Sequence, residues 1–145
     1  MAFIVSINKD EVFPVITLKD DEADSSVEVY CFGALLNCFK IKDADNVIDA
    51  FTSPQDAMAN ITNAFKSAKL SPFVCRIENG EYVFNSKAYK IDKFYLGNEA
   101  IHGLLYDAYF SISKTGADNN HAFVTLEYKY SNDKPTSFIP SIAKS

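Results

Sequence analysis

The strongest structural signal in this sequence is a two-residue alternation of apolar and polar side chains, repeated in short runs along most of the chain. Between Ala122 and Tyr130, apolar residues at every second position alternate with Thr125, Glu127 and Lys129. Such alternation is typical of a β-strand with one buried face. The same runs are rich in β-branched and aromatic residues, which also favour strands. The chain is therefore expected to be mainly antiparallel β-structure.

Nine or so strands follow from this pattern and from the turn residues between the runs. They cover Phe3–Ile7, Val12–Leu18, Val27–Phe32, Ala34–Ile41, Val74–Ile77, Tyr82–Asn85, Ala88–Ile91, Tyr106–Ile112 and Ala122–Tyr130. Pro14 indicates an edge or a bulge, because proline cannot donate to a sheet ladder. Asn79-Gly80 and Asn85-Ser86 are expected to form hairpin turns, and residues 116–120 a polar turn.

One segment departs from the alternation and predicts a short helix. Ser53 can cap its start, Pro54 suits the first helical position and Asp56 follows in the first turn. The apolar residues after Asp56 fall on one helical face, which predicts a helix that ends near Lys69. The fold expected from all these elements is an all-β antiparallel sandwich or barrel with one helix.

Length and composition restrict the organisation and the partners. A chain of 145 residues allows one domain or part of a larger one. We expect a β-domain over residues 1–130 and an irregular tail over 131–145, where the alternation stops and two prolines occur. A net charge of -5 argues against nucleic acid and against an anionic membrane surface. The chain contains no apolar run of the ~20 residues that a membrane-spanning helix needs.

The cysteines and histidines indicate a compartment and argue against a metal site. Three cysteines, at 31, 38 and 75, and an N-terminus without a signal-peptide pattern favour free thiols in a cytoplasmic, reducing environment. No pair has C-x-x-C spacing and only two histidines are present, so no metal site is expected. Phosphate loops, serine-nucleophile elbows and zinc-protease motifs are absent from the sequence, and no cofactor is expected.

Arg76 and His102 are the two candidate ligand-binding residues. Arg76 is the only arginine of the chain, and on a strand its guanidinium can offer a fork of donors to hydroxyl oxygens. The alternative is a surface arginine paired with a carboxylate. His102 follows a loop that contains Gly97, and its imidazole can donate, accept or exchange a proton. The alternative for His102 is a half-buried histidine with a structural role, and His121 is expected to be exposed in a turn.

The segment from Lys69 to Phe110 resembles the aldose 1-epimerase (galactose mutarotase) family. In that family an Arg-Ile-x-x-Gly run precedes a hairpin and a His-Gly follows on a later loop. Here these motifs match Arg76-Ile77-Glu78-Asn79-Gly80 and His102-Gly103. The resemblance implies a β-supersandwich fold, of which this chain matches the N-terminal half. It also implies that Arg76 and His102 bind the hydroxyl groups of a monosaccharide, an aldohexose such as galactose or glucose.

The family's reaction interconverts the α and β anomers of a free aldose. In the mechanism that the resemblance implies, a glutamate takes the proton of the anomeric hydroxyl and a second histidine protonates the ring oxygen. Family members are roughly twice as long as this chain, and that acid-base pair lies in the part not matched here. The catalytic residues are therefore unknown, and His121 is not assigned as the acid. We expect a carbohydrate-binding chain without the catalytic pair.

Two alternatives stay open. The chain is an active epimerase if other carboxylates serve as bases or if an oligomer completes the site, and Glu78, Glu99 and Asp107 lie nearest the motifs in sequence. Alternatively, it is a structural or interaction β-domain without sugar binding. Half of a sandwich also leaves open strand edges and an apolar face, which predicts a homodimer or a complex with a partner chain.

Overall fold

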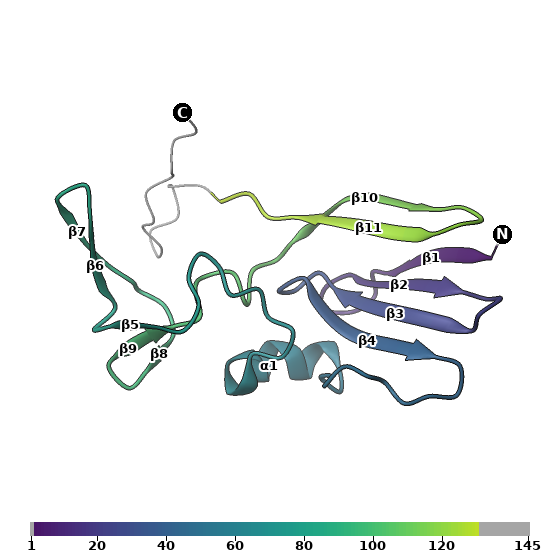
Figure 1. The fold of residues 1–145 in the computed structure, drawn as a ribbon, viewed down its shortest axis with the longest axis horizontal. Coiled ribbons are helices and arrows are strands. Elements are labelled where there is room, and N and C mark those ends of the chain that lie inside the picture. Colours follow the sequence, from purple (N-terminus) through teal and green to yellow (C-terminus); the bar gives the residue numbers. More distant parts are fainter. Residues whose placement is uncertain (1, 131–145) are drawn as a thin grey trace. The chain divides into compact units, whose positions relative to one another are not determined.

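The computed structural model describes residues 2–130, and antiparallel strands dominate it (Figure 1). The strands of the described part are β1 (Phe3–Asn8), β2 (Val15–Asp20), β3 (Ser25–Tyr30), β4 (Leu35–Ile41), β5 (Arg76–Glu78), β6 (Glu81–Phe84), β7 (Lys87–Lys90), β8 (Tyr95–Leu96), β9 (Glu99–Ile101), β10 (Ser111–Ala117) and β11 (Ala122–Glu127), and its helix is α1 (Pro54–Ala64). The predicted all-β class with one short helix is confirmed. The expected tail at 131–145 lies outside the described residues.

By their internal contacts, the described residues form two compact units. Unit 1 consists of residues 2–69 and 107–128, and unit 2 of residues 70–106 and 129–130. The predicted limits of a single domain, residues 1 and 130, stay a prediction.

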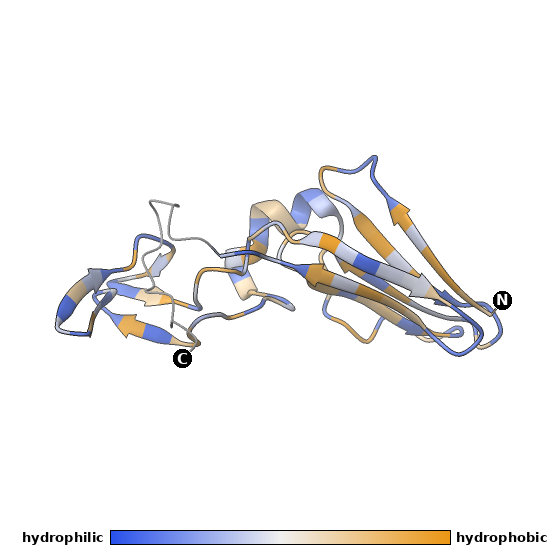
Figure 2. Ribbon diagram, turned by 90° about the horizontal axis from the view of Figure 1, so that it is seen from above, coloured by the Kyte–Doolittle hydropathy of each residue, from blue (hydrophilic) through white to orange (hydrophobic). Residues whose placement is uncertain are grey.

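Unit 1 is a sheet covered by a hairpin. Strands β1, β2, β3 and β4 pair in sequence order, each antiparallel to the next. The β10–β11 hairpin packs over β1 and β2 (Figure 1), and a pocket of about 140 Å³ between the two is lined by Phe3, Leu18, Val27 and Ala122 among others. Alternating hydropathy along these strands is visible in Figure 2. The two layers make this unit a sandwich, as the alternation predicted.

A buried polar side chain fixes the connection between β4 and the helix. Asn37 is 5% exposed and donates to the hydroxyl of Tyr30 (3.0 Å) and to the carbonyl of Phe51 (3.0 Å). Its Oδ1 accepts the amide of Phe51 (2.8 Å). These bonds satisfy both halves of the buried amide, as burial of a polar group requires. They hold residue 51 against β4 at the point where the chain leads into α1.

The helix begins as the sequence predicts but ends earlier. The Ser53 hydroxyl accepts the amide of Asp56 (3.0 Å), and Pro54 opens the first turn. Ala57 and Ile61 are the helix residues that are buried. The helix was expected to end near Lys69, but it ends at Ala64, because Phe65 takes a left-handed conformation (φ 52°) and closes the last turn. The hydroxyl of Ser67 then bonds the amide of Leu36 (2.9 Å), which ties the chain back to β4.

Unit 2 contains two small sheets over a small apolar core. Strands β5, β9 and β8 form one sheet, and β6 pairs with β7 in the other. Its core is a cluster of Ile91, Ala100 and Leu104, with Phe73, Ile77, Tyr82 and Tyr95 packed against it. The Asn85-Ser86 turn joins β6 to β7, as predicted, with a positive φ at both residues.

Several strand predictions were wrong in their limits or their partners. Asn79-Gly80 forms a tight turn, but the strands on either side belong to different sheets, so it is not a hairpin. The expected strand Tyr106–Ile112 is wrong: β10 begins at Ser111, and before it an isolated bridge joins Tyr109 to Phe32. The polar turn expected over residues 116–120 is shorter, because β10 extends through Ala117.

The hairpin of β8 and β9 was missed entirely. It is short, with two residue pairs, and its strands are joined by Gly97-Asn98. Gly97 has a φ of 64°, as the first position of such a two-residue turn requires. The Gly-Asn dipeptide is the signal in the sequence that predicts this turn.

Candidate functional site

Strands β5 and β9 bring the two sequence-predicted residues to one end of the same ladder. Arg76 opens β5 and pairs with Ile101, the last residue of β9. His102 follows directly, and its amide donates to the carbonyl of Cys75 (2.9 Å). Residues 26 positions apart in the sequence therefore become neighbours across the two strands.

The His102 ring is held by the backbone of the opposite strand. Its Nδ1 accepts the amide of Cys75 at 3.2 Å. In the neutral ring the proton therefore belongs on Nε2, which makes Nε2–H a hydrogen-bond donor. His102 has a φ of 62°, a conformation that few non-glycine residues adopt without support from surrounding structure. The paired bonds with Cys75 supply such support.

Gly103 follows His102 for a steric reason. Its φ is 78°, and a Cβ at this position would lie 2.3 Å from the carbonyl oxygen of Ser71. The next residue, Leu104, donates its amide to that same oxygen (2.7 Å). The His-Gly pair of the motif thus combines a constrained histidine with a glycine that lets the chain pass close to residue 71.

Arg76 forms an ion pair with Glu99 on the neighbouring strand. Its Nη1 lies 2.5 Å from Oε2 of Glu99, and the two side chains are 52% and 34% exposed. The expected alternative for this arginine, a pair with a carboxylate, is therefore present in the structure. A guanidinium has five N–H donors, so a single ion pair leaves it able to donate to a ligand as well.

Because of the strand register, the charged residues of this sheet lie on one face. Ile77 pairs with Ala100 and both contribute to the core cluster of unit 2. Their neighbours Arg76, Glu78 and Glu99 lie on the opposite face, because side chains alternate along a strand. Glu78 and Glu99 are direct cross-strand partners. This face, formed by Arg76, Glu78 and Glu99 next to His102, is called the β5–β9 face below.

The two other residues considered from the sequence, Asp107 and His121, belong to unit 1. Asp107 begins the second segment of unit 1. His121 lies in the turn between β10 and β11, also in unit 1, where its Nδ1 is 3.1 Å from Oδ1 of Asp118. The amides of Asn120 and His121 donate to the same carboxylate and lower the pKa of Asp118. His121 therefore takes part in a local turn, as its sequence setting suggested.

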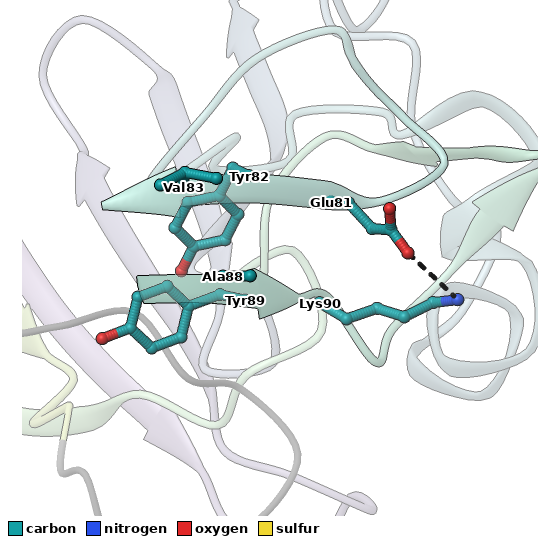
Figure 3. A pocket seen from close by; sticks show the side chains of 6 residues that line it. All are labelled: Glu81, Tyr82, Val83, Ala88, Tyr89 and Lys90. Atoms are coloured by element: carbon teal, nitrogen blue, oxygen red, sulfur yellow. Dashed lines mark ion pairs between the residues drawn. The ribbon is translucent and has the colours of Figure 1, made fainter. Parts of the chain in front are cut away.

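A separate pocket of about 360 Å³ lies along the β6–β7 hairpin (Figure 3). Tyr82 and Tyr89 stack across the two strands with ring centroids 5.3 Å apart. Tyr82 also packs against the core cluster, and Lys87 lies over the Tyr89 ring at 5.4 Å. The two rings therefore contact one another, and the Lys87 side chain also contacts the Tyr89 ring. Neither Arg76 nor His102 lines this pocket.

Between residues 2 and 130 no helix is long and apolar enough to cross a membrane. The same residues contain no group of three or more histidine, cysteine, aspartate or glutamate side chains arranged to hold a metal ion.

The thiols lie in three different environments. Cys31 is buried and Cys38 half-buried, and burial raises the pKa of both. Cys75 is exposed and lies beside Arg76 and His102. All three are free cysteines, with no disulfide between them.

Comparison with known proteins identifies the family. The sequence model of the family described as aldose 1-epimerase matches residues 14–139. The structure resembles a crystal structure of galactose 1-epimerase from Lactobacillus acidophilus NCFM, with a TM-score of 0.62 and 25% sequence identity. That match covers 86% of this chain and 36% of the Lactobacillus chain, so this chain spans about a third of its length. No curated protein matches the sequence. Because the family match covers most of its residues, the chain belongs to the aldose 1-epimerase family.

Proposed function

We propose that this chain binds a free aldohexose at the β5–β9 face through Arg76 and His102. The observation that carries the proposal is the pair of hydrogen bonds between His102 and Cys75. These bonds hold the imidazole so that its Nε2–H is a hydrogen-bond donor. The neighbouring strand, β5, begins with Arg76, whose guanidinium supplies further donors.

The chemistry of this face suits a sugar. Each sugar hydroxyl can both donate and accept, and recognition needs groups of both kinds. Arg76 and His102 supply donors, and the carboxylate of Glu99 supplies acceptors. Because Glu99 also restrains the guanidinium, less side-chain freedom is lost when a ligand binds. The family membership supports the same ligand class.

Binding is tested by isothermal titration calorimetry with galactose and with glucose. The unmodified chain is expected to give a saturable heat with at least one of the two sugars. Arg76→Ala should lose this heat, while Lys90→Ala, a matched removal of one exposed cation on β7, should keep it. Lack of binding by the unmodified chain would contradict the proposal.

We further propose that these 145 residues bind the sugar without interconverting its anomers. The family reaction needs an acid and a base that both reach the sugar. Support comes from Glu99, whose carboxylate pairs with Arg76, and from His121, whose ring contacts the carboxylate of Asp118. Polarimetry of fresh α-D-galactose and α-D-glucose decides the point. The optical rotation should relax at the same rate with and without micromolar protein.

A catalytic chain is the second candidate, because Glu78 lies on the same face as Arg76 and is exposed. If Glu78 acts as the base, the chain accelerates mutarotation, and Glu78→Gln abolishes the acceleration while sugar binding persists. A structural or interaction domain is the third candidate. It predicts no heat with either sugar in the calorimetric experiment.

Self-association is part of the proposal. Strands β1 and β4 are the outer strands of the four-stranded sheet, and each carries an exposed isoleucine: Ile4 is 42% exposed and Ile41 is 50% exposed. Apolar residues on a sheet edge favour pairing with another strand. Sedimentation velocity should therefore show a dimer at micromolar concentration, and Ile41→Lys should shift it toward monomer. A monomeric unmodified chain at that concentration would refute the proposed self-association.

The three free thiols support a reducing location, for which we propose the cytoplasm. Fractionation of cells that express the tagged chain tests this assignment.

A further inference from the structure

The β5–β9 face carries more negative than positive charge. The three-stranded sheet of β5, β9 and β8 has three charged residues, Arg76, Glu78 and Glu99, all on the same face. Arg76 and Glu99 form an ion pair and neutralise one another. Among the described residues, no cation lies within ion-pair distance of Glu78, which is exposed. One carboxylate therefore remains beside the proposed sugar site.

Glu78 lies close enough to the proposed sugar site for its charge to act on a bound ligand. It is the direct cross-strand partner of Glu99, which places the Cβ atoms of the two residues about 4.5–5.5 Å apart. Glu99 in turn reaches diagonally across the ladder to Arg76. A ligand that contacts Arg76 and Glu99 thus lies within the ~10 Å over which exposed charges interact at moderate ionic strength.

We propose that Glu78 determines the charge class of the ligand, so that the site accepts neutral and cationic aldoses and rejects phosphorylated or carboxylated ones. This inference rests on the proposed sugar binding at the same face. A sugar phosphate would have to compete with Glu99 for Arg76 and lie beside the carboxylate of Glu78. An aminosugar would place an ammonium group in a negative field instead. Specificity of this kind comes from the repelled ligand as much as from the favoured one.

The test is an NMR titration that follows the amides of Cys75 and His102. The Cys75 amide donates to the His102 ring, so its shift reports directly on that ring. Galactose, galactosamine and galactose 6-phosphate are compared at pH 7 and low salt, with 2-deoxygalactose as the control for the 2-hydroxyl that galactosamine lacks. Galactosamine is expected to bind about two- to fivefold more tightly than 2-deoxygalactose, the range of a single exposed ion pair. Galactose 6-phosphate should bind more weakly than galactose by a similar factor.

Two variants separate the role of Glu78 from net charge. Glu78→Gln should remove most of both differences, and the unmodified chain in high salt should behave in the same way because exposed charges are screened. Glu81→Gln, on β6, makes the same change in net charge. The carboxylate of Glu81 lies 4.0 Å from the ammonium group of Lys90, and this variant should preserve the differences in affinity between the sugars. Loss of the differences in Glu81→Gln to the same extent would overturn the assignment to Glu78.

The outcomes distinguish this inference from the proposed function. If all four sugars shift both amides with equal affinity, or if galactose 6-phosphate binds best, the charge selection is wrong and sugar binding stands. If none of the four sugars perturbs either amide, the proposed function fails and the inference fails with it.

Discussion

Cys75 and His102 are joined by two hydrogen bonds, one from each backbone amide. The Cys75 amide donates to Nδ1 of the imidazole (3.2 Å), and the His102 amide donates to the Cys75 carbonyl (2.9 Å). The histidine is thereby fixed both in its backbone and in its ring. Arg76 comes one residue after Cys75, so the same two bonds set the position of the histidine relative to the arginine.

The substitution His102→Asn removes the imidazole ring but introduces a residue that tolerates the positive φ at this position. Asparagine adopts positive φ more readily than most residues, so the conformation at residue 102 should persist. The Nε2–H donor is lost, and affinity for galactose should fall about tenfold, as loss of a hydrogen bond between polar partners costs roughly 1 kcal/mol or slightly more. Calorimetry measures the affinity. Unchanged affinity in a folded His102→Asn chain would remove His102 from the site.

Gly103→Ala should destabilise unit 2 strongly. A Cβ at residue 103 would lie 2.3 Å from the Ser71 carbonyl oxygen, in addition to the cost of positive φ for alanine. Together these effects should lower the free energy of unfolding by about 3 kcal/mol or more. Urea unfolding followed by circular dichroism measures the loss.

Gly97→Ala is the matched control for Gly103→Ala. Its φ of 64° is similar, but a Cβ would meet nothing within 4 Å. Only the conformational cost remains, and the loss should be about 1 kcal/mol. Equal losses in the two variants would show that the contact with Ser71 has no role in stability.

Asn37→Leu should destabilise unit 1. The change leaves the amide and the carbonyl of Phe51 without their partner in a buried setting. Each unsatisfied group costs about 1–3 kcal/mol, so the loss of both bonds should lower the free energy of unfolding by about 2–6 kcal/mol. Asn63→Ala, on the exposed part of α1, should change it by no more than ~0.5 kcal/mol. Similar small effects for both variants in urea unfolding would contradict a structural role for the Asn37 bonds.

Protonation of Asp56 should lower the free energy of unfolding in acid. Hydrogen bonds from the Thr52 amide and from the Asn60 side chain lower the pKa of Asp56 below its ordinary value of 3.8. Because the folded pKa lies below the unfolded one, the contribution is present above about pH 3.8 and is lost as the pH falls through the folded pKa. Asp56→Asn should flatten the decrease of unfolding free energy between pH 4 and ~2. An unchanged slope would contradict this assignment.

Thiol labelling should distinguish Cys75 from the other cysteines. Cys75 is exposed, whereas burial raises the pKa of Cys31 and Cys38 and reduces their thiolate fraction. A disulfide reagent at pH 7.5 should therefore react rapidly with one thiol, and Cys75→Ser should abolish the rapid phase. Saturating galactose should slow this phase if sugar lies at the β5–β9 face. A rapid phase that survives Cys75→Ser would contradict the assignment.

Much of the fold could be predicted from local patterns, because alternation and turn residues act within a few positions. The start of α1 is an example, since Ser53, Pro54 and Asp56 act together over four residues. Its end was not predictable in the same way, because the left-handed Phe65 and the bond from Ser67 to β4 depend on tertiary contacts. The pairing of strands could not be predicted from local patterns either, because β5 and β9 are more than twenty residues apart in the sequence.

The candidate site shows the same limit. The residue types and the His-Gly motif pointed to Arg76 and His102, but not to the partners that hold them. The contact between Glu99 and Arg76 follows from a register that becomes visible only once β8 and β9 are recognised as a hairpin. The role of Cys75 rests on its backbone, which carries no signature in the side-chain sequence.

The most direct test of sugar binding at Arg76 and His102 is an NMR titration of the ¹⁵N-labelled chain with galactose. If galactose binds at these residues, the amides of residues 75, 76 and 102 show saturable shifts, and Arg76→Ala loses these shifts while the rest of its spectrum is retained. Shifts confined to the β6–β7 hairpin, or the same shifts at residues 75 and 102 in Arg76→Ala, would contradict binding at these residues.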